Sequence, residues 1–314
     1  MKICVTGGAG FIGSNIVDAY VEAGHEVVIL DNFSSGKWEN VNPGAKVYEL
    51  DINDENVEKI FFEEKFEVLN HHAAQMDVRV SVRDPKFDAS TNILGGLNLY
   101  EAAKNSGVKK IIFASTGGAI YGEQDYFPAD EDHPQRPYSP YGISKLANEK
   151  YLFYYRQVYG LNYVALRYTN VYGPRQNPHG EAGVIAIFAS KMLEGGQPRI
   201  NGDGEQTRDY VYVGDVVRAN LLALGENADG IYNVATGIES SVNDLFRILK
   251  DETGSGCDEI HAPAQAGEQM RSVCSYGKIQ RELGWKPAVG LKEGLQKTVR
   301  FFDAKTGGRD ASNS

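Results

Sequence analysis

Residues 6–13 read TGGAGFIG, and this stretch determines which fold the sequence can adopt. It follows a short apolar run at 2–6 that we expect to be a strand, and it opens an expected helix at 12–23. The closely spaced glycines permit a tight turn and the near approach of a pyrophosphate, whose charge the free N–H groups of the helix terminus stabilise. The stretch therefore predicts a dinucleotide-binding loop; a glycine-rich turn without a ligand is the alternative.

An acidic residue about 20 residues further along the chain completes the fingerprint of such a loop. Asp31 ends the second expected strand, at 26–31. A carboxylate at this point accepts hydrogen bonds from both ribose hydroxyls of NAD, but it repels the 2′-phosphate of NADP. The sequence therefore favours NAD as the cofactor, and Lys37 is the nearby cation that keeps NADP as an alternative.

Short β-rich runs alternate with longer helical patterns over the first part of the chain. This alternation predicts an α/β fold with a doubly wound parallel sheet, the Rossmann arrangement, in which helices cover both faces. Besides the elements already named, the expected strands are 46–50, 67–73, 109–115 and 163–168, and the expected helices are 57–64, 87–106 and 141–159.

The composition changes beyond Gly173, where a stretch rich in turn residues precedes shorter mixed elements. We expect an NAD-binding domain at 1–172, to which later segments around 205–235 return. A smaller mixed α/β substrate lobe is expected at 173–305, and a disordered tail at 306–314.

A second motif, PYSPYGISK, carries the predicted chemistry. Tyr141 and Lys145 are four residues apart, so a helix presents both side chains on one face. A lysine ammonium beside a phenol, with a positive nicotinamide ring near both, is expected to lower the pKa of Tyr141 toward neutral pH. Thr116 follows an expected strand at the place where a hydroxyl faces the cofactor. These three residues are the predicted catalytic set; a tyrosine packed beside a snorkelling lysine is the alternative.

Charge and composition limit the partners of the chain. Its 42 acidic and 32 basic residues give a net charge of −10, which disfavours nucleic acid and an anionic membrane surface as partners. The apolar run at 184–189 is far shorter than the roughly 20 residues of a membrane span, so we expect a soluble cytoplasmic protein. The 3 cysteines and 6 histidines lack metal-ligand spacing, and no metal site is expected.

Together the motifs resemble the extended short-chain dehydrogenase/reductase family, and within it the NAD-dependent UDP-glucose 4-epimerases and their relatives. The resemblance covers nearly the whole chain and rests on TGGAGFIG, DNFSSG, the Asp51-Ile52 pair, HHAAQ, TNILGGLNL, STGGAIYGE, YGISK, LRYTNVYGPRQ and TRDYVYVGD. It implies a homodimer joined through the expected helices 87–106 and 141–159.

The resemblance also implies two sets of binding residues. Besides Tyr141 and Lys145, the expected NAD contacts are Gly7, Gly10, Phe11, Ile12, Gly13, Asp31, Asn32, Ser35, Gly36, Asp51, Ile52, Ala73, Ala74, Gln75 and Asn92. Besides Thr116 and Tyr141, the expected contacts of the nucleotide sugar are Asn170, Val184, Asn201, Arg208, Tyr210, Glu268 and Arg271.

Two positions among these motifs bear on the substrate. Gln265 stands where relatives carry an arginine that grips the diphosphate, and we expect Arg271 to take over that role. Ser272 stands where residue size limits the sugar pocket of related epimerases, and a small side chain there leaves room for a 2-acetamido group. For Arg208 the alternative is a solvated surface charge, and for Asn170 a turn residue.

The resemblance implies inversion of C4 of a UDP-hexose through a transient 4-keto sugar, with UDP-glucose and UDP-galactose as the first pair. UDP-N-acetylglucosamine and UDP-glucuronate are the alternative substrates. A dehydratase is disfavoured because Gly117, Gly118 and Ala119, directly after Thr116, offer no proton-transferring side chain. A non-catalytic NAD-binding sensor is disfavoured because it would not need the complete catalytic set.

Overall fold

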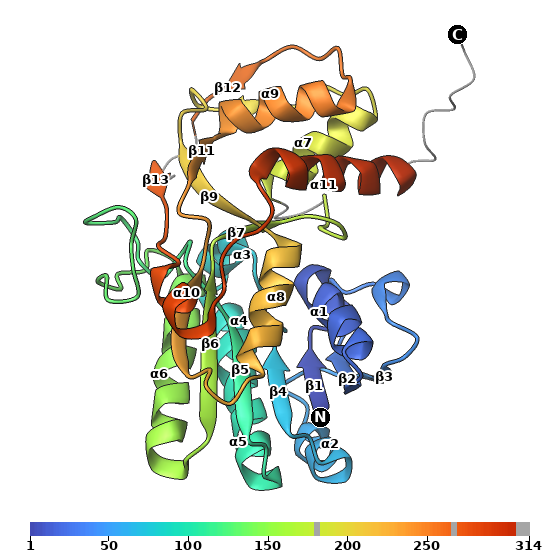
Figure 1. Ribbon diagram of the computed structural model, residues 1–314, viewed down its shortest axis with the longest axis vertical. Helices are drawn as coiled ribbons and strands as arrows, with labels where there is room; N and C mark the ends of the chain where they lie inside the picture. The colour runs from blue at the N-terminus through green and yellow to red at the C-terminus, as the bar shows by residue number, and fades with distance from the viewer. Residues whose placement is uncertain (179–182, 265–268, 306–314) are drawn as a thin grey trace.

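A seven-stranded sheet forms the centre of the computed structural model, which describes residues 1–178, 183–264 and 269–305 (Figure 1). All of its neighbouring strands pair in parallel, in the order β10-β6-β5-β4-β1-β2-β3. The order reverses between β1 and β4, and ligands of such sheets bind outside the carboxyl ends of the strands at this point. The strands are β1 Lys2–Thr6, β2 Glu26–Asp31, β3 Lys46–Glu49, β4 Val68–His71, β5 Lys110–Thr116, β6 Asn162–Tyr168 and β10 Gly230–Val234.

Helices cover both faces of this sheet, as the doubly wound prediction requires. Alternating side chains of each strand feed two separate cores, so that Ile3 and Val5 join one and Cys4 joins the other. The first core includes α1 (Phe11–Glu22), α8 (Val213–Ala223) and α10 (Gly277–Leu283), and the second includes α2 (Asn56–Glu64), α5 (Gly95–Ser106) and α6 (Pro140–Tyr159).

A smaller lobe lies beyond the carboxyl ends of the strands, at the top of Figure 1. Its sheet is built around β9 (Thr207–Tyr212), which pairs with β7 (Asn170–Tyr172), β11 (Glu239–Ser241) and β13 (Arg271–Ser272). The helices α7 (Val184–Leu193), α9 (Val242–Thr253) and α11 (Leu291–Lys305) enclose a third core against it. A two-stranded sheet pairs β8 (Ile200–Asn201) with β12 (His261–Ala262).

The chain crosses between the two lobes several times. β7 and β9 belong to the small sheet, although both lie in segments that we expected to belong with the large sheet. α8 and β10 do return to the large sheet, and α10 packs on the same core from much further along the chain. Each lobe is therefore assembled from segments that are far apart in sequence.

The expected helix 87–106 is longer and more complex than its sequence pattern indicates. It begins as α4 (Pro85–Ala89), where the Asp84 side chain accepts a hydrogen bond from the Phe87 N–H at 3.0 Å. A π-helical turn, Ser90–Leu94, then joins α4 to α5. A short helix that the sequence pattern did not indicate, α3 (Val78–Arg83), precedes it. In the described part of the chain, no helix is long and apolar enough to cross a membrane.

A fully buried ion pair joins β6 to α6. The guanidinium of Arg167 donates to the two carboxylate oxygens of Glu149 at 2.9 and 2.7 Å, and neither side chain is exposed. The Ser115 hydroxyl donates to the same carboxylate at 2.6 Å, and Arg167 also donates to the Tyr121 hydroxyl at 2.9 Å. This forked geometry satisfies both charges out of water and links three elements near the carboxyl ends of the strands.

Replacing Arg167 by leucine should lower the free energy of unfolding by about 3–5 kcal/mol, because it leaves the buried Glu149 carboxylate without its counter-charge. Guanidinium chloride unfolding followed by circular dichroism measures the change. The control is Arg247→Leu, which removes an ion pair to Glu259 from the exposed surface of α9 and should change stability little. Equal losses in the two variants would contradict the role given to the buried pair.

Candidate active site

The glycine loop has the geometry of a phosphate cradle. Gly7 has a φ of +69°, and a Cβ at this position would lie 2.7 Å from the backbone nitrogen of Ala73. A Cβ on Gly13 would lie 2.2 Å from the Gly7 carbonyl oxygen. Gly10 caps α1 without a side-chain hydrogen bond, so the first N–H groups of the helix are not satisfied by a capping side chain. These features fit the pyrophosphate of a dinucleotide.

The Asp31 carboxylate lies beside this loop and is largely buried. It accepts hydrogen bonds from the backbone N–H groups of Ala9 at 2.9 Å and Phe33 at 2.8 Å. A carboxylate has about four acceptor positions, so these two bonds leave capacity for ribose hydroxyls. The neighbouring Asn32 side chain donates to Asp51 at 2.7 Å, which brings the expected residues after β2 and β3 together. The adjacent Ile52 is buried, whereas Ser35 is exposed.

The segment after β4 continues the same edge of the sheet. The backbone N–H of Ala73 donates to the Thr6 hydroxyl at 3.2 Å, which holds the segment against the end of β1. Gln75 and Asn92 are bound to each other twice, through the Gln75 N–H and the Gln75 carbonyl, each at 2.9 Å. The expected NAD residues that follow β1, β2, β3 and β4 therefore lie along one edge of the sheet, and Asn92 joins them from the π-helical turn.

The predicted catalytic residues come together at the end of β5 and the start of α6. The Lys145 ammonium donates to the carbonyl of Ala114 at 2.8 Å, two residues before Thr116. It lies 4.9 Å from the centroid of the Phe113 ring and 5.7 Å from that of Tyr141. Lys145 thus extends from α6 to the end of β5, and its ammonium lies near the ring of Tyr141 on the same helix.

The protein groups raise the pKa of Tyr141, contrary to our expectation that it falls toward neutral pH. Burial of the phenol is the main cause, and the negative charge of Asp88 adds to it. Burial also lowers the pKa of Lys145 to about 8, against the opposing effect of Asp88. Lys145 alone therefore does not offset the burial of the tyrosine. Our expectation also included the positive charge of a bound nicotinamide ring, which the protein itself does not supply.

Asp88 itself was missed by the sequence interpretation. It is fully buried, and its carboxylate accepts hydrogen bonds from Gln75, Asn92 and Ser144 at 3.1, 2.9 and 2.6 Å. The available signal was its position four residues before Asn92, which places both on one helical face. The contact with Ser144, which precedes Lys145, depends on tertiary packing.

The small sheet places three of the expected substrate residues, together with Ser272, on one face. Asn170 pairs with Tyr210, and Ser272 pairs with Arg208. Directly paired residues of neighbouring strands point to the same side, and so do residues two apart on one strand, so these four side chains share a face. Val184 begins α7 and packs in the same core as Tyr210.

Arg271 points to the opposite face of this sheet. It pairs with Thr207, one residue before Arg208, and its guanidinium binds both carboxylate oxygens of Glu239 at 3.0 and 2.7 Å. It also lies 3.9 Å from the centroid of the Phe127 ring. The structure therefore does not bring Arg271 to Arg208. Asn201 lies exposed on β8, and Gln265 and Glu268 lie outside the described residues.

Asp209, which the sequence interpretation also missed, joins the two lobes. It lies on β9, on the face of the small sheet that carries Arg271. Its buried carboxylate accepts hydrogen bonds from the hydroxyl and the N–H of Thr236, at 2.7 and 2.9 Å. Thr169, Gly237 and Cys274 donate to it as well. Because Thr169 follows β6 and Thr236 follows β10, one carboxylate fixes β9 against the ends of two strands of the large sheet.

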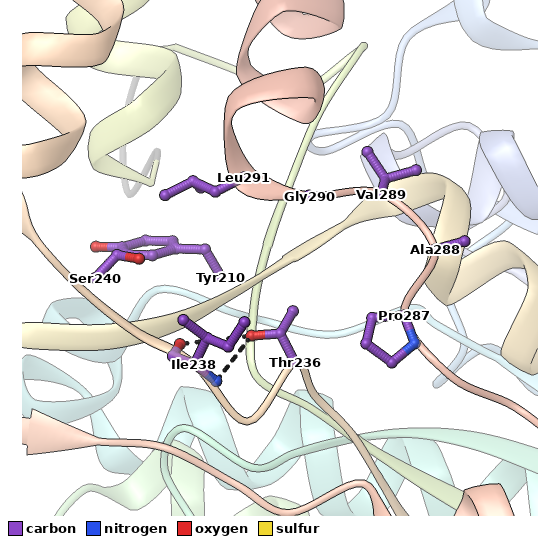
Figure 2. A pocket seen from close by; sticks show the side chains of 9 residues that line it. All are labelled: Tyr210, Thr236, Ile238, Ser240, Pro287, Ala288, Val289, Gly290 and Leu291. Carbon is purple, nitrogen blue, oxygen red and sulfur yellow. Dashed lines mark hydrogen bonds between the residues drawn. The ribbon is translucent and has the colours of Figure 1, made fainter.

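A hollow of about 190 Å³ lies beside Tyr210, between β11 and the segment that leads to α11 (Figure 2). No charged side chain lines it, so it does not suit a diphosphate group. Figure 2 shows the Thr236 hydroxyl hydrogen-bonded to the backbone of Ile238. The lining residues are Tyr210, Thr236, Ile238, Ser240, Pro287, Ala288, Val289, Gly290 and Leu291.

The histidines of the HHAAQ motif have structural partners. His71 hydrogen-bonds the Thr6 hydroxyl at 2.8 Å, and His72 hydrogen-bonds the Tyr168 hydroxyl at 3.1 Å. Burial, together with the charge of Lys145, lowers the pKa of His72 to about 3, so it is neutral. Within the described ranges, no three His, Cys, Asp or Glu side chains are placed to hold a metal ion.

Comparisons with known proteins agree with this geometry. Residues 3–235 match the family described as the NAD dependent epimerase/dehydratase family. The chain is 43% identical over 312 residues to a UDP-glucose 4-epimerase of Mycolicibacterium smegmatis, with 98% of this chain and 100% of that protein covered.

Two solved structures are similar over nearly their whole length. A Thermotoga maritima UDP-glucose 4-epimerase with UDP-glucose has 51% identity and a TM-score of 0.96, covering 98% of this chain and 100% of that one. A Thermus thermophilus UDP-glucose 4-epimerase in complex with NAD has 48% identity and a TM-score of 0.91, covering 96% and 99%.

Replacing Gly13 by alanine should weaken NAD binding by about tenfold or more, because overpacking the loop costs ~1–3 kcal/mol. Isothermal titration of the cofactor-free protein with NAD measures the change, and thermal unfolding without NAD checks the fold. The control is Gly256→Ala, where an added Cβ meets no atom within 4 Å. Unchanged affinity in the Gly13 variant would rule out this loop as the pyrophosphate site.

Proposed function

Because the chain belongs to the NAD-dependent epimerase/dehydratase family, we propose that it inverts C4 of a UDP-hexose, with UDP-glucose and UDP-galactose as the leading pair. The observation that carries the proposal is that Lys145 contacts both the end of β5, which carries Thr116, and the ring of Tyr141, in a chain whose glycine loop fits a dinucleotide. The similarity to an epimerase solved with UDP-glucose supports the choice of substrate.

The three catalytic residues divide the proton chemistry between them. When bound, NAD supplies the acceptor and the donor of hydride for the sugar carbon. The Tyr141 oxygen takes the proton of the sugar 4-hydroxyl as a general base and returns it after the transient 4-keto sugar has presented its other face. Thr116 hydrogen-bonds the same sugar oxygen, and Lys145 binds the nicotinamide ribose and favours the phenolate electrostatically.

Because the pKa of Tyr141 is raised, the proposed chemistry requires that NAD is bound in the site. Burial and Asp88 favour the neutral phenol, so Tyr141 becomes a base only when further positive charge lies beside its ring. The same arrangement keeps the tyrosine unreactive in the absence of cofactor. The NAD-binding residues for this arrangement are those of the glycine loop, the Asp31 and Asp51 segments, and the segment around Gln75 and Asn92.

For the nucleotide sugar we propose the face of the small sheet that carries Arg208. A guanidinium suits bidentate binding of a diphosphate, and Asn170 and Tyr210 share this face. Arg271 would have to exchange the Glu239 carboxylate for the diphosphate in order to contribute. The remaining substrate contacts in this proposal are Val184, Asn201 and Glu268.

UDP-N-acetylglucosamine is the second candidate substrate. Ser272 pairs with Arg208, is buried, and carries one of the smallest side chains. A small residue on this face leaves space for a 2-acetamido group. Dehydration is disfavoured because Gly117, Gly118 and Ala119 bring no acid or base to the sugar.

We also propose a homodimer joined through α5 and α6. Large apolar side chains of α6 are exposed, including Phe153 at 54% and Val158 at 56%. Leu94, which precedes α5, is 58% exposed, and Phe87 on α4 is 51% exposed. Exposed apolar patches on a protein surface mark interaction sites.

Incubation of the purified protein with UDP-glucose, UDP-N-acetylglucosamine and UDP-glucuronate in separate samples tests the reaction. Anomeric proton signals in NMR spectra should reveal the C4 epimer of UDP-glucose. Tyr141→Phe should reduce turnover by about 10²- to 10⁴-fold, since it removes the general base. Tyr138→Phe, in the exposed segment just before α6, is the matched control and should retain activity. A product from none of the three sugars would overturn the proposed function.

Sedimentation velocity at micromolar concentration tests the dimer. The protein should sediment at twice its chain mass, and Phe153→Lys should shift it toward the monomer, because a charge is then placed in an apolar interface. Leu222→Lys is the control, since Leu222 is 39% exposed on α8, which covers the opposite face of the large sheet. A monomeric parent protein would contradict the proposal.

A further inference from the structure

Asp88 is a buried carboxylate with no ion-pair partner among the residues that the structure describes. Its three hydrogen-bond donors come from three parts of the site. Gln75 belongs to the segment after β4, Asn92 to the π-helical turn, and Ser144 to the first turns of α6. A buried charge is costly unless its environment is built for it, so three converging donors indicate a function for the negative charge.

We propose that Asp88 is a positioning residue whose negative charge keeps Lys145 protonated and thereby sets the pH range in which Lys145 and Tyr141 work together. The inference deepens the proposed function, on which its kinetic test rests. Ser144, its 2.6 Å partner, directly precedes Lys145 and follows Tyr141 by three residues, so the carboxylate is anchored to the turn of α6 that carries both side chains.

The π-helical turn fixes Asp88 in this place. Asn148 on α6 donates to the carbonyl of Asn92 at 2.9 Å and to that of Ser144 at 2.8 Å. It thus ties the turn that follows Asp88 to the same part of α6 that carries the catalytic residues. Single π-helical turns are rare and occur frequently at functional sites. The position of the charge relative to Lys145 is therefore fixed by side chains on both helices.

The charged groups around Lys145 and Tyr141 leave Asp88 as the carboxylate that acts on them. His71 and His72 on β4 are kept neutral, because burial and the charge of Lys145 lower the pKa of each. Glu149, one turn beyond Lys145 on α6, is bound by Arg167. Asp77, at the start of α3, is partly buried and its carboxylate accepts a hydrogen bond from the Val80 N–H. Exposed charged groups nearby are Arg79 and Arg83 on α3 and Asp84 and Lys86 around the start of α4.

The effects of Asp88 on its two neighbours have the same sign. Its charge raises the pKa of Lys145, which burial lowers to about 8, and it raises the pKa of Tyr141. Activity requires ionised Tyr141 and protonated Lys145, so the pKa values of these two groups together bound the pH range of activity. Removing the carboxylate lowers both values and moves the whole active range to lower pH.

Asparagine at position 88 removes the charge with little change of shape. Its Oδ1 can still accept from Gln75 and Asn92, and its amide nitrogen can donate to the Ser144 hydroxyl. In the NAD-loaded protein, Asp88→Asn should move both limbs of the pH profile of UDP-glucose epimerisation down by about one pH unit. Asp251→Asn, an exposed carboxylate on α9, is the matched control and should leave the profile in place.

A titration without substrate separates this inference from the proposed function. The ¹³Cε signal of Lys145, assigned with Lys145→Met, should titrate at lower pH in Asp88→Asn than in the parent protein. If the asparagine variant does not fold, Asp88→Ser removes the same charge. A lower turnover at every pH with unmoved limbs, or an unchanged Lys145 titration, would overturn the proposal. Failure of the parent protein to epimerise any sugar would overturn the proposed function, and the lysine titration would still decide on Asp88.

Discussion

The buried ion pair between Arg167 and Glu149 is the constraint on which the catalytic geometry depends. Two charges removed from water are tolerated only in a complete set of hydrogen bonds, and here Ser115 and Tyr121 complete it. Ser115 directly precedes Thr116, and Glu149 follows Lys145 by one helical turn. The same network that satisfies the charges therefore fixes the end of β5 against α6, which determines how threonine, tyrosine and lysine meet.

Much of the large sheet follows from local sequence patterns. β1 and β2 have the expected bounds because their apolar runs are flanked by turns and by the glycine loop. α6 begins at Pro140, one residue before its expected start, because the fixed φ of proline suits the first helical position and the Ser139 hydroxyl caps the helix. The line of cofactor residues could be anticipated for the same reason, since a parallel sheet brings the carboxyl ends of its strands to one edge.

The features that sequence reasoning missed all depend on contacts between distant segments. The face of Arg271 is decided by the register of a strand of two residues, and a shift of one residue reverses every side chain. The raised pKa of Tyr141 is a consequence of burial, which no spacing rule reports. Asp88 becomes recognisable only when β4 and α6 bring Gln75 and Ser144 to it, and the π-helical turn is anchored by Asn148 from another helix.

The repeated crossing of the chain between the lobes has an evolutionary consequence. β10 and α8 complete the large sheet only after β7 and β9 have entered the small one, and α10 returns later still. A single recombination event between residues 169 and 274 would therefore separate the Asp209 carboxylate from at least one of its donors. Neither lobe can be exchanged as one continuous segment of the gene.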